Sequence, residues 1–340
     1  MGAATVQDQG TWTVALSHRW QYSDRHFVGS EEQVHREQEG SQVINDVHLI
    51  DLSASYTFTK RLSATLSIPF QFATRSQAVR DTRRNPDGSL MNPSDYASPE
   101  GVVSGAVIDR YQTSASGLSD IKLLATSWIL DPDENPKMNF SFGAGVVIPT
   151  GQKDHKDTFT VFATNSAGQY TPRAEIRNVD NSIQPGSGAW GIIADVYGYR
   201  ELFTNFTIYA AATYIFVPEE DADVYDGPND TGQVWSTGDS YLARIGLGYE
   251  FLPKYGLSFT LAGRLEGSPP TDVFGSDEGR RRPGYAISIE PGLLYAKDGW
   301  FASFSAPVAL YRKRQANFAG AEGDAAFADF MTIFSAGRSF

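Results

Sequence analysis

Apolar and polar residues alternate with a period of two along much of this chain. In the first such run, Trp12, Val14 and Leu16 fall on one face of an extended backbone, and Thr13 and Ser17 fall on the other. This alternation is typical of β-strands with one apolar face, so it predicts an all-β fold. Twelve such runs occur, at residues 12–22, 50–58, 62–72, 121–129, 140–146, 190–196, 206–216, 241–251, 257–265, 285–295, 300–310 and 330–340.

The links between the runs alternate strictly between short and long. Short links lie around Lys60 and at residues 131–137, 200–204, 253–256 and 297–299. Long polar segments separate them, at residues 23–42, 73–118, 149–188, 217–239, 267–283 and 312–327. Outer-membrane barrels show this asymmetry because their periplasmic turns are tight and their extracellular loops are long. We therefore predict one domain, a transmembrane antiparallel up-and-down β-barrel of about twelve strands at residues 11–340, preceded by a periplasmic N-terminal segment at residues 1–10.

The two faces of the runs distinguish this barrel from a soluble β fold, which is the alternative. The polar face is mostly Gly, Ala, Ser, Thr and Asn with sparse charges, and such small residues suit the interior of a narrow barrel. The apolar face ends in aromatic residues such as Trp12 and Tyr22, as expected at the two membrane interfaces. The last run closes on Phe340, which resembles the sorting signal of outer-membrane barrels. These features favour a location in the bacterial outer membrane of a Gram-negative cell.

The composition excludes several kinds of site. The 340 residues contain no Cys, so disulfide bonds, thiolate metal sites and Cys nucleophiles are excluded. The net charge of −12 disfavours a nucleic acid as partner. No run approaches the roughly 18 apolar residues of a membrane-spanning helix. The start Met1-Gly2-Ala3-Ala4 lacks the basic and apolar regions of a signal peptide, so we interpret the sequence as a mature chain with an added Met.

Three short motifs lie at the ends of predicted strands. They are Gly117-Leu118-Ser119-Asp120, Ile148-Pro149-Thr150-Gly151 and Gln184-Pro185-Gly186-Ser187-Gly188. Locally, the prolines can end strands because they have no N–H for the ladder, and the glycines permit turns with positive φ. In this order, the motifs resemble those of the outer-membrane family of phenol meta-pathway (MetA-type) transporters, over residues 50 to the C-terminus. The resemblance implies an outer-membrane channel for small organic molecules.

Strand parity places a set of charged and aromatic side chains inside the barrel. Charges in a low-dielectric interior are costly unless they are paired. These charges therefore either form a constriction that selects solutes by charge and size, or pair across the lumen and plug it. The predicted lumen or constriction residues are Arg19, Asp51, Lys122, Asp195, Tyr197, Tyr199, Tyr209, Arg244, Glu250, Arg264 and Glu290. The charged residues Asp120, Glu266, Lys313 and Asp329 are also expected to point inward.

Two of the long loops carry charge clusters. An acidic loop is a weak candidate for Ca²⁺, although it lacks the twelve-residue ligand spacing, and a solvated loop is the alternative. Its candidate ligands are Asp221, Asp223, Asp226 and Asp230. Arg280, Arg281 and Arg282 in another loop are suited to the phosphates of lipopolysaccharide or to ion pairs with the acidic loop.

Two histidines, His18 and His48, fall on the lipid-facing side of adjacent predicted strands. One hypothesis is that they approach each other and bind a metal ion. The alternatives are a shift of register and an oligomer contact that buries His18.

Two functions of different classes follow from the pattern. The first is a passive outer-membrane channel, porin-like, for small solutes that include aromatic or hydrophobic ones. The alternative is a structural or partner-binding barrel with a plugged lumen, whose loops or outer wall dock another protein or a second copy of the chain. The sequence shows no nucleophile–base pair, so we expect neither catalysis nor a cofactor. The expected partners are outer-membrane lipid, lipopolysaccharide and the permeant itself.

Overall fold

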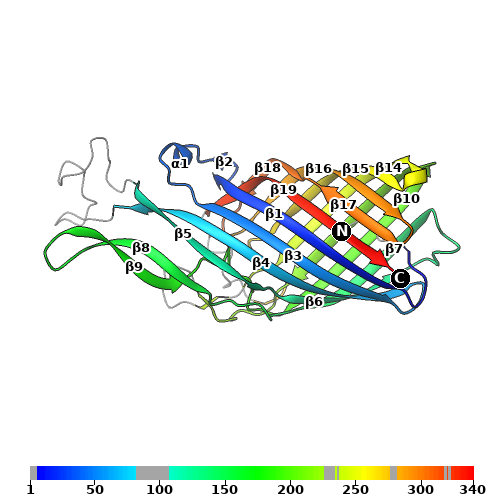
Figure 1. Ribbon diagram of the computed structural model, residues 1–340, viewed down its shortest axis with the longest axis horizontal. Coiled ribbons are helices and arrows are strands. Elements are labelled where there is room, and N and C mark those ends of the chain that lie inside the picture. Colours follow the sequence, from blue (N-terminus) through cyan, green and yellow to red (C-terminus); the bar gives the residue numbers. More distant parts are fainter. Residues whose placement is uncertain are drawn as a thin grey trace.

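Twelve antiparallel strands close into a barrel in the computed structural model (Figure 1). The structure describes residues 6–81, 107–225, 234–235, 237–275, 282–317, 320 and 323–340. Two of the twelve barrel strands are interrupted, so that β5 with β6 makes one strand and β17 with β18 makes another. The barrel elements are β1 (Trp12–Val28), β3 (Ile44–Thr57), β4 (Leu62–Arg80), β5 (Val107–Leu118), β6 (Ile121–Trp128), β7 (Met138–Ile148), β10 (Gly191–Phe203), β11 (Phe206–Phe216), β14 (Ser240–Leu252), β15 (Leu257–Ser268), β16 (Gly284–Lys297), β17 (Trp300–Ser305), β18 (Val308–Arg314) and β19 (Asp324–Ser339).

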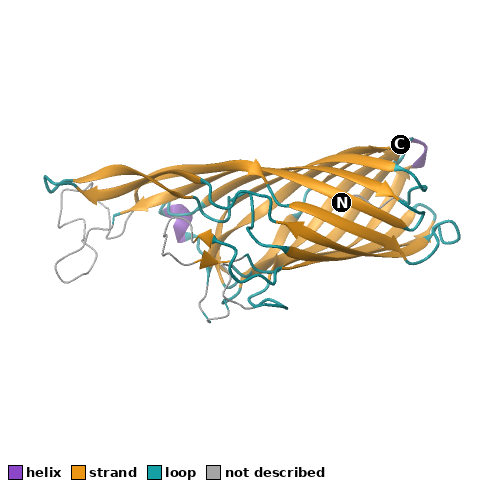
Figure 2. Ribbon diagram, turned by 90° about the horizontal axis from the view of Figure 1, so that it is seen from below, coloured by secondary structure: helices purple, strands orange, loops and turns teal. Residues whose placement is uncertain are grey.

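Neighbouring strands pair in chain order, and the last strand returns to the first. β19 pairs with β1 along almost its whole length, from Thr13 opposite Ser339 to Val28 opposite Asp324. The N–H of Trp12 donates to the carbonyl oxygen of Phe340 at 2.9 Å and completes the seam. Both views show strands inclined to the barrel axis, with the C-terminus at one end and the hairpin of β8 (Lys156–Thr164) and β9 (Tyr170–Asn178) projecting from the other (Figures 1 and 2).

The outer wall carries an apolar belt. Leu16, Phe142 and Ile245 lie mid-strand and have exposed fractions of 53%, 59% and 61%. A water-soluble surface rarely exposes so many large apolar side chains together, whereas a lipid-facing wall requires them. The alternate positions face the lumen, as the period-two pattern predicted, so the predicted transmembrane barrel is confirmed.

The strands extend far beyond this belt on the side of the long loops. β4 continues to Arg80 and β5 begins at Val107, well inside the segment 73–118 that we expected to be a loop. The segment 149–188 also contains the β8–β9 hairpin. Short elements complete the links: β2 (Glu31–Glu32), α1 (His35–Gln38), β12 (Val224–Tyr225), β13 (Val234–Trp235) and the 3-10 helix η3 (Pro253–Tyr255). Among the described residues, no helix has the length and apolar character needed to cross a membrane.

A β-bulge near the start of β18 changes one predicted orientation. Ile287 pairs with Tyr311 and the next residue, Ser288, pairs with Ala309, so Leu310 is an extra residue on β18. The bulge reverses the parity that follows it, as expected for one inserted residue. Lys313 is consequently exposed instead of facing inward, and the neighbouring Arg312 is buried in its place.

Candidate functional site

The three sequence motifs meet at one point of the barrel wall, where β5 gives way to β6. The carboxylate of Asp120 is buried and accepts hydrogen bonds from the N–H groups of Gly151 (3.0 Å) and Ser187 (2.7 Å). Gly151 and Gly186 lie so close that a Cβ on Gly151 would come within 2.5 Å of the Cα of Gly186. The motifs therefore form a structural junction, which explains why these positions need glycine and a carboxylate.

From this junction, residues 179–189 pass along the inner wall at the outer mouth of the barrel, and we call them the mouth segment. Val179 and Ile183 are fully buried in one apolar cluster with Ala73 and Ala115. The side chain of Gln71 on β4 donates from Nε2 to the carbonyl oxygens of Ile183 (2.9 Å) and Gln184 (3.1 Å). The mouth segment is thus packed against the wall rather than lying free above it.

Asp180 forms ion pairs that link the mouth segment to two other parts of the barrel. Its carboxylate accepts from Arg282 Nη1 and Nη2 at 2.8 and 2.6 Å, and Arg75 Nη2 lies 3.4 Å from Oδ2. Burial alone raises the pKa of the Asp180 carboxyl, but Arg282 and Arg75 outweigh burial and hold this pKa well below its usual range. We call Asp180, Arg282 and Arg75 the mouth latch.

An ion-pair network occupies the opposite wall of the lumen. Glu290 on β16 lies 3.1 Å from Arg244 Nη1 and 3.2 Å from Arg264 Nη1, and it accepts from Ser305 Oγ at 3.0 Å. Arg264 also donates to Glu266 at 2.6 Å. Sequence parity predicted that these charges face inward, and the structure brings Arg244, Arg264 and Glu290 together. These pairs join the neighbouring strands β14, β15 and β16 along one wall, so they are not the pairs across the lumen that the plugged-lumen alternative expected.

The remaining predicted lumen charges are more dispersed. Asp51 accepts from Ser67 Oγ, and Asp195 accepts from Thr213 Oγ1 at 2.6 Å. Within the described ranges, the Arg19 Nε finds no hydrogen-bond partner. Glu250 lies near the periplasmic end of β14, opposite Ser258, and it is not part of the network.

Aromatic side chains line the periplasmic part of the lumen. The rings of Tyr197 and Tyr199 lie 6.1 and 5.9 Å from the ring of Trp128, centroid to centroid, in edge-to-face geometry. Tyr209 is directly opposite Tyr199 in the pairing of β10 with β11. Its ring lies over Gly246, where an added Cβ would come within 2.7 Å of the phenol. The two tyrosines were predicted for the lumen from parity. In the run 121–129, Leu124 and Trp128 fall on the otherwise polar face, and this aromatic cluster explains the inward position of Trp128.

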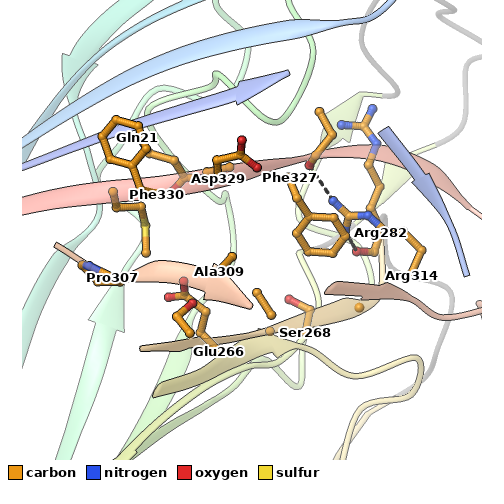
Figure 3. Close-up of a pocket in the computed structure, with 17 residues that line it drawn as sticks. Gln21, Glu266, Ser268, Arg282, Pro307, Ala309, Arg314, Phe327, Asp329 and Phe330 are labelled. Carbon is orange, nitrogen blue, oxygen red and sulfur yellow. Dashed lines mark hydrogen bonds between the residues drawn. The ribbon is translucent and has the colours of Figure 1, made fainter. Parts of the chain in front are cut away.

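Two of the cavities in the described part of the structure open into the lumen. One has a volume of about 230 Å³ and lies against β1, β15, β16, β18 and β19, where Glu266, Asp329 and Phe327 border it (Figure 3). In the same region, Arg314 donates from Nη1 to the carbonyl oxygen of Arg282 at 3.0 Å. The second cavity, of about 310 Å³, lies beside the mouth segment. Its apolar lining comes from Leu49, Pro69, Val147, Pro185, Ala189, Ile215, Val217 and Val224. Its polar lining comes from Gln71, Ser119, Asp120, Lys122, Asn181, Gln184, Ser187, Thr237 and Ser240.

The loop candidates from the sequence stay predictions. Asp221 and Asp223 are exposed, and Asp223 lies 3.9 Å from Lys153, whereas Asp226 and Asp230 fall outside the described residues. Over the part of the chain that the structure describes, no three His, Cys, Asp or Glu side chains converge as metal ligands. Arg280 and Arg281 also fall outside the described residues.

Sequence reasoning missed the mouth latch. Arg282 was considered for lipopolysaccharide, and Asp180 was not singled out at all. The two residues lie 102 positions apart in different loops, so no local pattern connects them. The only available signal was that the arginine cluster directly precedes a predicted strand, which places it at the barrel mouth.

The fold is similar to that of solved outer-membrane proteins. An outer membrane channel from Pseudomonas putida F1 matches with a TM-score of 0.61 and 12% identity, covering 100% of this chain and 99% of that one. The toluene transporter TbuX of Ralstonia pickettii matches with a TM-score of 0.51 and 12% identity, covering 98% and 90%. The toluene transporter TodX of P. putida has a TM-score of 0.51 and 10% identity, covering 98% and 91%.

No family model matches the chain, and the comparison with curated proteins gave no match. At 10–12% identity, the structural likeness concerns the fold. It confirms that this chain has the barrel architecture of outer-membrane transporters, as the sequence predicted.

Proposed function

We propose that this protein is an outer-membrane channel for the passive uptake of small solutes, including aromatic or hydrophobic ones. The observation that carries the proposal is the cavity of about 310 Å³ beside the mouth segment. Its lining combines apolar and polar side chains in similar numbers, and small organic molecules bind in sites where apolar walls carry placed polar groups. Solved barrels of similar fold include toluene transporters, and this supports the same class of permeant.

The lumen suggests a route in two stages for such a solute. A molecule would first occupy the cavity beside the mouth segment, where Leu49 and Val147 contact its apolar part and Lys122 lies at the edge. It would then pass between the charged network around Glu290 and the opposite wall toward Trp128, Tyr197 and Tyr199. Aromatic rings at the exit offer stacking contacts without strong binding, which allows release.

Proteoliposome swelling tests the proposal directly. The purified full chain is inserted in vesicles, which are then diluted into isotonic arabinose or sodium benzoate, with protein-free vesicles as the control. We expect protein-dependent swelling in both solutions, and faster swelling with the aromatic solute. Swelling no faster than that of protein-free vesicles, together with no conductance steps in a planar bilayer, would overturn the proposal.

A second candidate function is a partner-binding barrel with a closed lumen. The mouth segment and the Glu290 network both fill space inside the barrel, and the β8–β9 hairpin projects outward with Ile176 76% exposed. A barrel that passes no solute but retains a stable protein partner through purification would favour this function over the channel.

A further inference from the structure

A polar chain of four side chains crosses the lipid-facing side of β1 and β3, which lie next to each other in Figure 1. The chain consists of His18, His48, Asp46 and Trp20. On the same face, Leu16 and Leu52 are exposed apolar side chains of the belt. A lipid-facing wall normally carries apolar residues at such positions, because polar groups are costly against hydrocarbon. The strand register is regular here, so a register shift does not account for the histidines.

The histidines face each other at close range. His18 Nε2 lies 3.0 Å from His48 Nδ1, and the two ring planes are within 10° of parallel. A hydrogen bond accounts for this distance, and a metal ion bound to both nitrogens would lie to one side of the line that joins them. The approach that the sequence raised as a hypothesis is therefore present.

A carboxylate lies near the other ring nitrogen of His48. His48 Nε2 lies 3.5 Å from Asp46 Oδ1, and the same oxygen accepts from Trp20 Nε1 at 2.8 Å. A carboxylate at this position favours the tautomer with its proton on Nε2. The lone pair of His48 Nδ1 is then directed toward His18.

We propose that His18 Nε2 and His48 Nδ1 are the two protein ligands of a divalent transition-metal site, of the Zn²⁺, Cu²⁺ or Ni²⁺ class, on the outer wall of the barrel. Imidazole nitrogen suits these ions. Two nitrogens bound tetrahedrally at about 2.0 Å from Zn²⁺ are roughly 3.3 Å apart, so the observed spacing needs to widen by only a few tenths of an ångström. Asp46 is a positioning residue, in the arrangement of carboxylate, histidine and metal that orients many imidazole ligands.

The site supplies two ligands and leaves the remaining positions open. As stated above, no third His, Asp or Glu of the described chain converges with them. Water, or phosphate oxygens of lipid headgroups, would complete the coordination from outside the barrel. The inference does not depend on solute transport, because the site lies on the opposite side of the wall from the lumen.

Copper electron paramagnetic resonance tests the site on the full chain, purified in detergent without a histidine tag. We expect one Cu²⁺ per chain and a spectrum with couplings to two nitrogens. His18→Gln and His48→Gln should each leave one nitrogen coupling and weaken binding about tenfold or more. His35→Gln is the matched control, because His35 is an exposed histidine on α1. This variant should change neither the number of nitrogen couplings nor the affinity for Cu²⁺.

Asp46→Asn separates positioning from ligation. We expect two nitrogen couplings to remain while the affinity falls about 10- to 100-fold, as for other residues that orient a ligating histidine through its second ring nitrogen. Repeating the wild-type measurement in vesicles containing phosphatidylglycerol and in phosphate-free detergent identifies water or lipid phosphate as the outer ligand.

A measurement on the wild-type chain tests the metal site even if the variants do not fold. Zn²⁺ should protect His18 and His48, but not His35, from modification by diethyl pyrocarbonate, as read by mass spectrometry. Equal modification with and without Zn²⁺ would overturn the proposal and leave the pair as a simple hydrogen bond. Unchanged copper stoichiometry in a folded His18→Gln, His48→Gln double variant would overturn it as well.

Discussion

Asp120 shows how a single buried carboxylate can join three distant parts of a chain. It accepts from the N–H groups of Gly151 and Ser187, which belong to two different motifs. We expect Asp120→Ala to lower the free energy of unfolding by about 2 to 4 kcal/mol, because two buried N–H groups lose a charged acceptor. Guanidinium unfolding in lipid vesicles measures the change. Glu134→Ala is the control, because Glu134 is exposed in a periplasmic link; equal effects of the two variants would argue against a junction role.

Glu290 is the residue on which the lumen network depends. Its side chain is only 5% exposed and lies within 3.2 Å of two guanidinium groups. We expect Glu290→Gln to destabilise the barrel by about 3 to 5 kcal/mol, because it breaks buried ion pairs. If channels form, the lumen also becomes more positive, so the reversal potential should shift toward anion selectivity.

Lys122→Gln is the matched change of opposite sign, since Lys122 borders the lumen cavity. It should shift the reversal potential toward cations. Shifts in the same direction for both variants would contradict the placement of these charges along the permeation path.

The mouth segment is an element whose attachment makes a prediction about pH. The pKa of Asp180 is held below its usual range by Arg282 and Arg75, despite burial. The pKa of an Asp in the unfolded chain is about 3.9, and the ion pairs of Asp180 stabilise the folded chain fully above this pH. This stabilisation is lost only as the pH falls through the still lower pKa that Asp180 has in the folded chain. We therefore expect the mouth latch to stay closed between pH 5 and 8, with no change of conductance in this range that depends on Asp180.

Asp180→Asn should loosen the attachment of the mouth segment at every pH, because the neutral amide no longer forms ion pairs with the arginines. We expect a severalfold rise in conductance or in the frequency of open events. Glu175→Gln is the control, because Glu175 pairs with Arg173 and Arg177 inside the hairpin. A conductance that rises at pH 5 in the wild type and is insensitive to Asp180→Asn would contradict the latch.

The elements differ in how far the sequence could predict them. The membrane-spanning parts of the strands were predictable, because lipid on one side and the lumen on the other enforce the alternation of runs such as 206–216. The outer parts of β4 and β5 and the β8–β9 hairpin were not, because water contacts both faces there and no period-two pattern is required. The bulge at Leu310 was not predictable either, because Leu310 and Tyr311 are both exposed on the apolar wall and both side chains suit that wall.

The residues of the candidate site also differ in how far the sequence could predict them. Parity predicted that Arg244, Arg264, Glu290, Tyr197 and Tyr199 face inward, because an inward side chain depends only on its own strand. Which of them touch depends on the register between neighbouring strands and on the conformation of each side chain, and parity determines neither. The mouth latch was even less predictable, because it joins two loops and no strand pattern determines the path of a loop.

The position of the whole barrel in the bilayer can be tested with two substitutions on one strand. Ile245 lies mid-strand on β14, and Leu252 ends the same strand at its periplasmic side, with exposed fractions of 61% and 42%. Arginine on the lipid face costs about 2 to 4 kcal/mol at the midplane and roughly 0 to 1 kcal/mol near the interface. We therefore expect Ile245→Arg to destabilise the barrel much more than Leu252→Arg, as measured by reversible unfolding in phosphatidylcholine vesicles. Because both variants add the same charge to the same strand, only depth in hydrocarbon separates them, and equal costs would mean that the apolar belt does not face lipid.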